Sequence, residues 1–363
     1  MKKNINIIIF LILFLIISVP LFGIRGSGGE KSESENRVLA SKPSLFLEDS
    51  KLNPNLKSEF NAWLNDNIGF RNEMIQLNTD INYKIFDKVS NNDVLVGKEN
   101  WLFYQGEGKV SISNYQAINH YSENELQTIL KNVMELKEWC ESNGMEFVLM
   151  LIPNKEYIYS EYLPEGIIEV NKKKNIDLVV EYIRSHSDVN VVYPKDALIE
   201  GKKTHSVYYK YDTHWNPYGA YIGYSELLKS IGMEPITFNN FKSKKVLNNE
   251  GDLSNMAVLN DKLIPYEEFK IKDSSKCIFD DKQGNLSYQK YTSDDLNGKS
   301  IFFMGDSFRM AIKPYLNQSF KYTNYVHRER KDFEEAIQEN TDVFVYEIVE
   351  RYVNTLLYSN LYE

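Results

Sequence analysis

The sequence predicts an α/β fold in which a mostly parallel sheet is covered by helices on both faces, a three-layer sandwich. Two observations predict it. Short apolar runs of strand length recur along the chain, and each is next to a segment whose apolar residues have helical spacing. Such alternation is typical of parallel sheets, whose strands are joined by crossover helices. The 363 residues are enough to bury a core of that size.

The helices are predicted from apolar spacing and from capping residues. Residues 55–90 have helical apolar positions, and a second helix begins at Ser122, which forms a capping box with Glu125. Gly144 can end that helix. Its apolar residues recur at helical spacing: Leu126, Ile129, Leu130, Val133, Leu136 and Cys140.

The strands are predicted from continuous apolar runs, which indicate burial on both faces of a sheet. These runs are residues 147–152, 189–193, 300–304 and 343–346, with a helix near 175–185 between the first two.

The chain is predicted to have three parts. Residues 1–25 form a membrane anchor or a signal sequence, residues 26–50 a flexible linker rich in Gly, Ser and charge, and residues 51–363 the catalytic domain. The polar stretch 233–298 interrupts the strand and helix rhythm and is interpreted as an insertion within that domain.

The N-terminus indicates an extracytoplasmic location. Lys2 and Lys3 precede an apolar run over residues 5–24, which is long enough to span a bilayer as an N-terminal helix. The positive-inside rule keeps the lysines in the cytoplasm and places the rest of the chain outside. A cleaved signal peptide, and hence a secreted protein, is the alternative.

Charge and cysteine content exclude some functions. A net charge of −9 argues against a nucleic-acid partner, because phosphate binding needs clustered Lys and Arg. Cys140 and Cys277 could form one disulfide, although Cys140 falls on an apolar helix face where a thiol is more often a small buried hydrophobe.

A Gly305-Asp306-Ser307 turn follows the strand at 300–304. Ser307 therefore lies at the carboxyl end of a strand, where α/β proteins bind ligands, and a helix can begin directly after it. The motif by itself is weak, because Asp-Ser after a strand is also ordinary helix-capping chemistry.

A second candidate element pairs Asp212 with His214. Asn216 and Pro217 can start a helix, so both residues lie in the loop before it. A spacing of two lets the Asp212 carboxylate reach Nδ1 of the imidazole, which leaves Nε2 free to take a proton from a serine such as Ser307.

Three other interpretations of this pair remain open. Asp212 could cap a turn, His214 could be a buried structural histidine, and an Asp-x-His pair could bind a metal. The remaining histidines show no ligand-like spacing with the pair, so no metal and no cofactor is predicted. They are His120, His186, His205 and His327.

The chain resembles the DHHW and alginate O-acetyltransferase (AlgJ and AlgX) family. Two stretches together carry the resemblance, Asp212-Thr213-His214-Trp215 and Gly305-Asp306-Ser307-Phe308. Further matches are Phe70-Arg71, residues 97–104 ending in Trp101-Leu102-Phe103-Tyr104, Pro153-Asn154-Lys155 and Gly251-Asp252-Leu253. The resemblance implies a circularly permuted SGNH-hydrolase-like fold and a triad of Asp212, His214 and Ser307. Where the family often has a second histidine, this chain has Thr213.

The family resemblance also implies a function and partners. We expect an extracytoplasmic O-acetyltransferase that acts on a polysaccharide through an acyl-serine, beside an AlgI-like membrane-bound O-acyltransferase. A glycan acetyl esterase with the same triad and a non-catalytic polysaccharide-binding subunit are the alternatives. Asn154, Tyr104, Glu347 and Arg351 are further candidates for oxyanion or substrate binding. Glu347 and Arg351 could pair just past the strand at 343–346, at the sheet edge that carries Ser307, and a plain surface ion pair is the favoured interpretation of that pairing.

Overall fold

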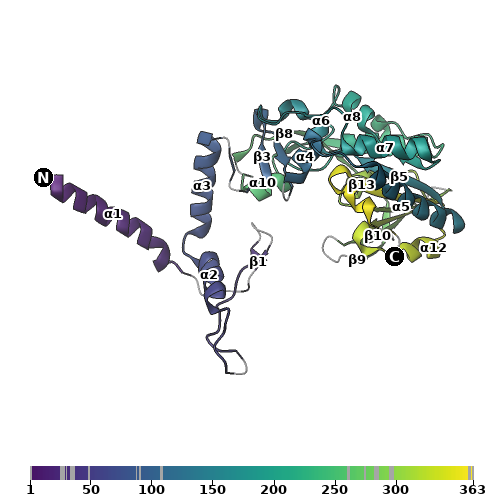
Figure 1. Cartoon of the computed structure of the whole chain (residues 1–363). Coiled ribbons are helices and arrows are strands. Elements are labelled where there is room, and N and C mark those ends of the chain that lie inside the picture. Colours follow the sequence, from purple (N-terminus) through teal and green to yellow (C-terminus); the bar gives the residue numbers. More distant parts are fainter. Residues whose placement is uncertain are drawn as a thin grey trace. The chain divides into compact units, whose positions relative to one another are not determined.

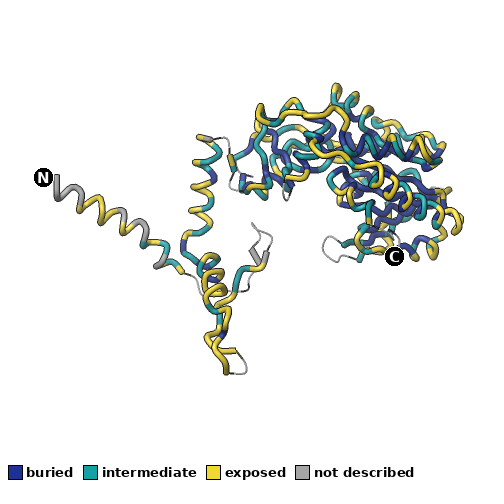
Figure 2. The backbone as a smooth tube through the Cα atoms, in the orientation of Figure 1, coloured by how far each residue is buried: buried dark blue, intermediate teal, exposed yellow. Residues whose placement is uncertain are grey.

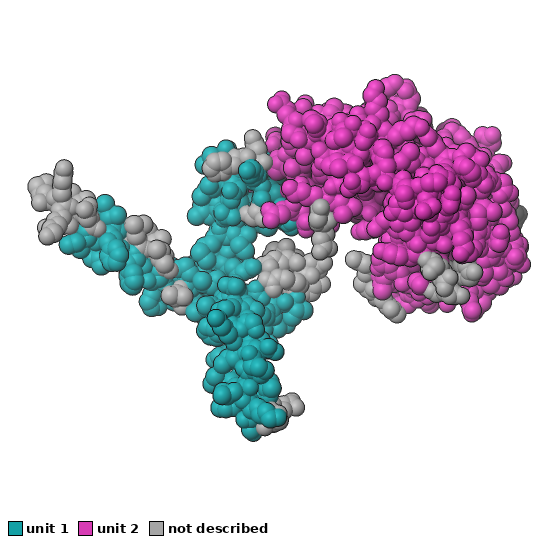
Figure 3. Space-filling view, in the orientation of Figure 1, with its two compact units in different colours: residues 1–91, 255–259 teal, residues 92–254, 260–363 magenta. Residues whose placement is uncertain are grey.

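A computed structural model describes residues 2–24, 29, 31–32, 37–47, 50–86, 88–89, 91–106, 109–259, 262–273, 275–281, 286–293, 298–358 and 361. The chain divides into two compact units (Figures 1 and 3). One comprises residues 1–91 and 255–259, and the other residues 92–254 and 260–363. The sequence predicted one domain from residue 51, whereas the unit that carries the sheet begins at residue 92. Several residues of the predicted linker at 26–50 lie outside the described part.

The first unit is mainly helical. Its elements are α1 (Lys2–Phe22), β1 (Lys31–Ser32), β2 (Arg37–Val38), α2 (Leu56–Asn67) and α3 (Arg71–Phe86). The helical segment predicted at 55–90 is thus two helices, with Phe70 at a φ of +57° between them.

Among the residues that the structure describes, none of the helices combines the length and the apolar character that a bilayer span requires. The predicted N-terminal anchor is not confirmed.

A seven-stranded sheet forms the centre of the second unit, in the order β6-β5-β13-β11-β12-β10-β9. Neighbouring strands from β6 to β12 run parallel, while β10 runs antiparallel to both β12 and β9. The sheet is therefore mostly parallel, and the predicted α/β class is confirmed. Its strands are β5 (Glu146–Ile152), β6 (Asn190–Val192), β9 (Lys276–Asp281), β10 (Tyr288–Thr292), β11 (Ser300–Gly305), β12 (Tyr322–His327) and β13 (Val343–Val349).

Helices and two small hairpins surround this sheet. The hairpins are β3 (Val94–Val96) with β4 (Leu102–Tyr104), and β7 (Ser243–Asn248) with β8 (Tyr266–Ile271). The helices are α4 (Val110–Gln116), α5 (Glu123–Ser142), α6 (Lys155–Ile158), α7 (Asn175–His186), α8 (Lys195–Gly201), α9 (Pro217–Ser230), α10 (Asp252–Ala257), α11 (Arg309–Leu316) and α12 (Phe333–Gln338), with the 3-10 helix η7 (Glu350–Leu357) after β13.

The core lies on both faces of the sheet as two apolar clusters, and Figure 2 shows the buried segments gathered in the unit that carries the sheet. Along β5, Val148 and Met150 pack into one apolar cluster, and Leu149 and Leu151 into the other. Side chains alternate across a strand, so a continuous apolar run serves two cores at once. Burying each such side chain contributes about 1.5–3 kcal/mol. Helices α9 and α11 contribute to the first cluster, and α5 and α7 to the second.

Several local predictions are confirmed. The capping box at Ser122 is present, and Gly144 adopts a φ of +79° directly after the end of α5. The expected insertion at 233–298 also supplies β9 and β10 to one edge of the central sheet. The disulfide that the sequence left open is not formed, because Cys140 is a buried thiol on α5 and Cys277 an exposed one on β9.

Candidate active site

Ser307 lies in the turn between β11 and α11, at the carboxyl end of a central strand. The turn is held by Asp306, whose Oδ1 accepts the Phe308 N–H at 3.0 Å and whose Oδ2 accepts the Val349 N–H of β13, also at 3.0 Å. Asp306 and Phe308 are buried, while Ser307 is exposed. The turn thus presents the serine hydroxyl to solvent on a rigid support.

Glycine is required at position 305 because a buried glutamate lies against it. A Cβ at Gly305 would collide with Glu347 of the neighbouring strand. Oε2 of the same glutamate accepts the Asp306 N–H at 3.0 Å. The close approach of β11 and β13 therefore fixes the backbone one residue before the serine.

His214 is placed by the loop that precedes α9. Asn216 caps this helix by accepting the Gly219 N–H at 3.0 Å, and Pro217 occupies the first helical position. Trp215, which is fully buried, donates its indole N–H to the Phe308 carbonyl at 3.0 Å. That bond ties the histidine loop directly to the serine turn.

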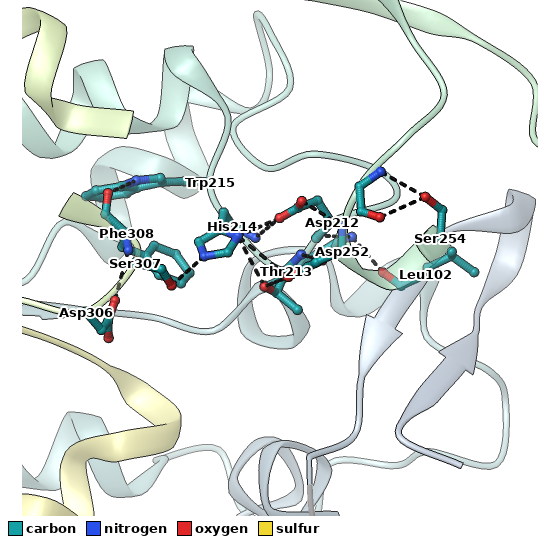
Figure 4. A network of polar contacts seen from close by, with 12 residues as sticks. Leu102, Asp212, Thr213, His214, Trp215, Asp252, Ser254, Asp306, Ser307 and Phe308 are labelled. Carbon is teal, nitrogen blue, oxygen red and sulfur yellow. Dashed lines mark hydrogen bonds and ion pairs between the residues drawn. The ribbon is translucent and has the colours of Figure 1, made fainter. Parts of the chain in front are cut away.

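The structure brings Asp212, His214 and Ser307 together in one chain of contacts (Figure 4). Nε2 of His214 is 2.6 Å from Oγ of Ser307, and Nδ1 is 2.6 Å from Oδ1 of Asp212. An ionised carboxylate only accepts hydrogen bonds, so Nδ1 carries the proton and neutral Nε2 can accept from the serine. This is the arrangement in which a histidine acts as the general base for a serine nucleophile.

Asp212 and His214 each shift the pKa of the other. Burial lowers the pKa of His214, but the hydrogen bond and the negative charge of Asp212 outweigh it, so that this pKa lies above the ordinary value of 6.5. Burial raises the pKa of Asp212, but the same hydrogen bond and the charge of His214 reverse that effect and lower it. Asp212 therefore stays ionised, which is the state in which an aspartate can stabilise a neighbouring imidazolium.

A pH dependence follows from this pair. Because the base must be neutral, we expect kcat/KM for an acetate ester to rise with pH through an apparent pKa above 6.5. Hydrolysis of p-nitrophenyl acetate, corrected for the uncatalysed rate at each pH, measures it. An acid limb centred below 6.5 would contradict the assigned contact between Asp212 and His214.

Asp252 is a site residue to which the sequence assigned no role. Its backbone N–H donates to Oδ2 of Asp212 at 2.9 Å, and its Oδ1 accepts the Thr213 N–H at 2.8 Å. The Thr213 hydroxyl donates to Oδ2, which is 3.7 Å from Nδ1 of His214. Thr213, where the family often has histidine, thus holds the Asp252 carboxylate beside the imidazole. The Gly251-Asp252-Leu253 motif was the available signal.

A cavity of about 650 Å³ adjoins the serine. Ser307, His214 and Asp252 line part of it, and Arg309, Arg328 and Tyr352 line other parts. A substrate ester in this cavity would have both the nucleophile and its base within reach.

Two of the remaining predicted residues lie close to the serine, but they do not pair as expected. Glu347 lies within β13, not past its end, and is fully buried; burial, together with Asp306, raises the pKa of its carboxyl group well above the usual range. The Arg351 guanidinium instead contacts aromatic rings, at 5.4 Å from the Phe308 ring centre and 5.8 Å from that of Tyr104. No ion pair joins Glu347 to Arg351 in the described part of the chain.

Asn154 follows β5 of the central sheet, whereas Tyr104 lies in the separate hairpin of β3 and β4. Tyr104 ends β4, donates its backbone N–H to Glu156 at 3.1 Å and meets Arg351 through its ring. Asn154 is buried after β5 and donates its backbone N–H to Glu350 at 2.8 Å. Its side-chain amide has no hydrogen-bond partner among the described residues, and no contact described there joins it to Ser307. The structure therefore supports Arg351 as a neighbour of the site more directly than Asn154.

The family described as "SGNH hydrolase-like domain, acetyltransferase AlgX" matches residues 94–330, which is more than half of the chain. The chain belongs to this family. The match includes Asp212, His214, Asp252 and Ser307 and confirms the resemblance predicted from these motifs.

Related proteins of the AlgX-type family extend the comparison. The chain is 24% identical over 254 residues to a protein named probable alginate O-acetylase AlgJ from Azotobacter vinelandii, covering 67% of this chain and 58% of that protein. The AlgJ of Pseudomonas putida is 23% identical over 158 residues, covering 43% and 38%. The match thus spans about two fifths to three fifths of the length of these relatives.

Solved structures of the AlgX-type fold agree with the architecture. Bacillus cereus PatB1 superimposes with a TM-score of 0.54 at 18% identity, over 74% of this chain and 98% of PatB1. A DHHW family protein from Eubacterium siraeum gives 0.53 at 16% identity, over 74% and 96%. At these identities the likeness establishes the fold.

Proposed function

We propose that this chain is an O-acetyltransferase that transfers an acetyl group to hydroxyls of a polysaccharide through an acyl-Ser307 intermediate. The contact that carries the proposal is the pair of 2.6 Å distances that link Asp212 to His214 and His214 to Ser307. Membership of an acetyltransferase family and the AlgJ relatives support the acyl group and the acceptor class.

The mechanism follows from the site atoms. Nε2 of His214 takes the Ser307 proton as Oγ attacks the acetyl carbonyl of the donor, and the leaving group departs with that proton. A sugar hydroxyl then attacks acetyl-Ser307, with His214 again as base, and releases free serine. Asp212 holds the imidazole in one tautomer throughout.

The oxyanion of each tetrahedral intermediate needs donors. The Ser307 backbone N–H is one, because it has no acceptor among the described residues and lies one residue before Phe308, the N-cap of α11. The Arg351 guanidinium, against the Phe308 ring, is the second candidate.

An acetyl esterase is the second candidate function, because water can replace the sugar hydroxyl at acetyl-Ser307. The exposed serine favours this alternative, since water can reach it without displacing any part of the chain. A non-catalytic polysaccharide-binding subunit is the third, and it requires none of the observed contacts around His214.

Location and partner belong to the same proposal. The lysines before the apolar run at 5–24 support export of the chain, so that it acts outside the cytoplasm as an anchored or a secreted protein. A membrane-bound O-acyltransferase of the AlgI kind would then deliver the acetyl group.

Acetyl transfer to a defined acceptor tests the function. The full chain is incubated with p-nitrophenyl acetate and either oligomannuronate or chitooligosaccharide, and products are analysed by mass spectrometry. Acetylated oligosaccharide that is absent with the Ser307→Ala variant is the expected result. Acetate as the sole product indicates the esterase, and retained oligosaccharide binding with no ester turnover indicates the binding subunit.

A further inference from the structure

Lys155 is a buried cation next to the candidate triad. It begins α6 directly after β5, and its residue is only 2% exposed. Its Nζ donates three hydrogen bonds to backbone carbonyls, to Leu102 at 2.6 Å, to Lys210 at 2.9 Å and to Asp212 at 3.0 Å. An ammonium group has three donors and no acceptor, so every donor is used.

These carbonyls belong to two segments that are far apart in sequence. Leu102 lies in β4, whereas Lys210 and Asp212 lie in the loop before α9. The Leu102 N–H also donates to the Lys210 carbonyl at 3.1 Å. Lys155 therefore fastens the Asp212 loop to the β4 strand, and Figure 4 shows Leu102 on the Asp212 side of the network.

Asp212 is consequently held at both ends. Lys155 holds its carbonyl, while its carboxylate accepts the backbone N–H groups of His214 and Asp252, each at 2.9 Å. A side chain at Gly251 would collide with the Tyr211 carbonyl, so the loop has no space on that side. We infer that Lys155 is a positioning residue that holds Asp212 where its carboxylate meets Nδ1 of His214. This inference rests on the proposed function.

The role requires a charged amine. A neutral amine has two donors, so one of the three carbonyls would lose its partner. Burial lowers the pKa of Lys155 to about 7, against the opposing effects of Glu156, Asp212 and Asp252, and Lys210 lowers it further. These are the charged groups that face it from α6, α10 and the Asp212 loop; on the β4 side it meets the rings of Trp101 and Phe103.

The lowered pKa of Lys155 should affect how the rate depends on pH. Activity needs neutral His214 and charged Lys155, so the rate should rise through the His214 pKa and fall again as Lys155 loses its proton. The rate should therefore show a bell-shaped dependence on pH, with His214 on the acid limb and Lys155 on the alkaline limb.

The test compares full-length Lys155→Met and Lys155→Gln variants with the wild type. Met matches the lysine side chain without its amine and offers no donor, while Gln offers two donors at shorter reach. The exposed Lys131→Met on α5, whose side chain is 72% accessible, is the matched control. The readouts are the second-order rate of Ser307 sulfonylation by methanesulfonyl fluoride, and kcat and KM for p-nitrophenyl acetate, each against pH.

We expect Lys155→Met to lower kcat and the sulfonylation rate by roughly 10²-fold, because a misplacement of about 1 Å has that effect, with KM little changed. Its falling limb at alkaline pH should disappear, and Lys155→Gln should be intermediate. A merely structural role would lower thermal stability without changing the shape of the pH profile.

Each contrary outcome has one meaning. A sulfonyl adduct on Ser307 that forms at the wild-type rate in Lys155→Met overturns the inference while leaving the proposed function intact. Absence of any adduct on wild-type Ser307 rejects the proposed function itself. If Lys155→Met does not fold, Lys155→Gln decides, since sulfonylation of Ser307 at the wild-type rate in that variant overturns the inference.

Discussion

Replacing Ser307 with alanine is expected to lower kcat for p-nitrophenyl acetate by at least ~10³-fold, because the attacking oxygen is lost while the rest of the site remains. The loss should be this large because Oγ is the only group that Nε2 of His214 contacts at 2.6 Å in the described structure. The Ser307 side chain is exposed and does not belong to the core, so the variant should fold as the wild type does.

Ester turnover and a covalent adduct together check this expectation. Wild-type protein quenched during turnover should carry one acetyl group on the peptide that contains Ser307, as seen by mass spectrometry. Ser185→Ala, which removes an exposed hydroxyl from α7, is the matched control and should keep full activity. Full activity in Ser307→Ala, with no acetyl group on wild-type Ser307, would end the triad assignment.

The sequence predicted most of the sheet because apolar runs identify strands that are buried on both faces. Strands β9, β10 and β12 were not predicted, and β13 was predicted over 343–346 but extends to Val349. Glu347 interrupted the apolar pattern, and only the neighbouring turn explains a fully buried glutamate there, since its carboxyl group accepts the Asp306 N–H. Glu347 contacts a residue 41 positions away in the sequence, so the residues around it do not indicate that it belongs to a strand.

The sequence predicted those site residues whose side chains suit catalysis and which also lie at a predicted turn. Ser307 follows a strand, and Asp212 and His214 precede a capped helix, so each has a local sign. Asp252 has only the Gly251-Asp252-Leu253 motif as a sign, because it lies in a polar stretch and its contacts with Thr213 and the Asp212 carboxylate are made across about 40 residues of sequence. Lys155 belongs to the Pro153-Asn154-Lys155 motif, but its three carbonyl partners come from segments more than 50 residues away.

Replacing Asp212 with asparagine is expected to lower kcat by ~10³ to ~10⁴-fold. The carboxylate now accepts the Nδ1 proton at 2.6 Å and, at its two oxygens, the backbone N–H groups of His214 and Asp252. An amide has one acceptor oxygen and one NH₂ group. Its NH₂ would face either an N–H donor or Nδ1, and in the second case it would drive the proton to Nε2. His214 would then be unable to accept the Ser307 proton.

Asp252→Asn is the matched control, because it changes the same type of group one contact further away. Among the described residues, its Oδ1 and Oδ2 accept hydrogen bonds from Thr213, and its carboxylate is 3.7 Å from Nδ1, so the tautomer of His214 should be kept. We expect a loss of about 10-fold, since one of the two acceptors of Thr213 becomes a donor at roughly 1–2 kcal/mol. Steady-state rates for both variants, with the His214 ring protons followed by NMR, separate the two effects. Equal losses in Asp212→Asn and Asp252→Asn, or an unchanged Nδ1 proton in Asp212→Asn, would show that Asp212 does not set the tautomer of the base.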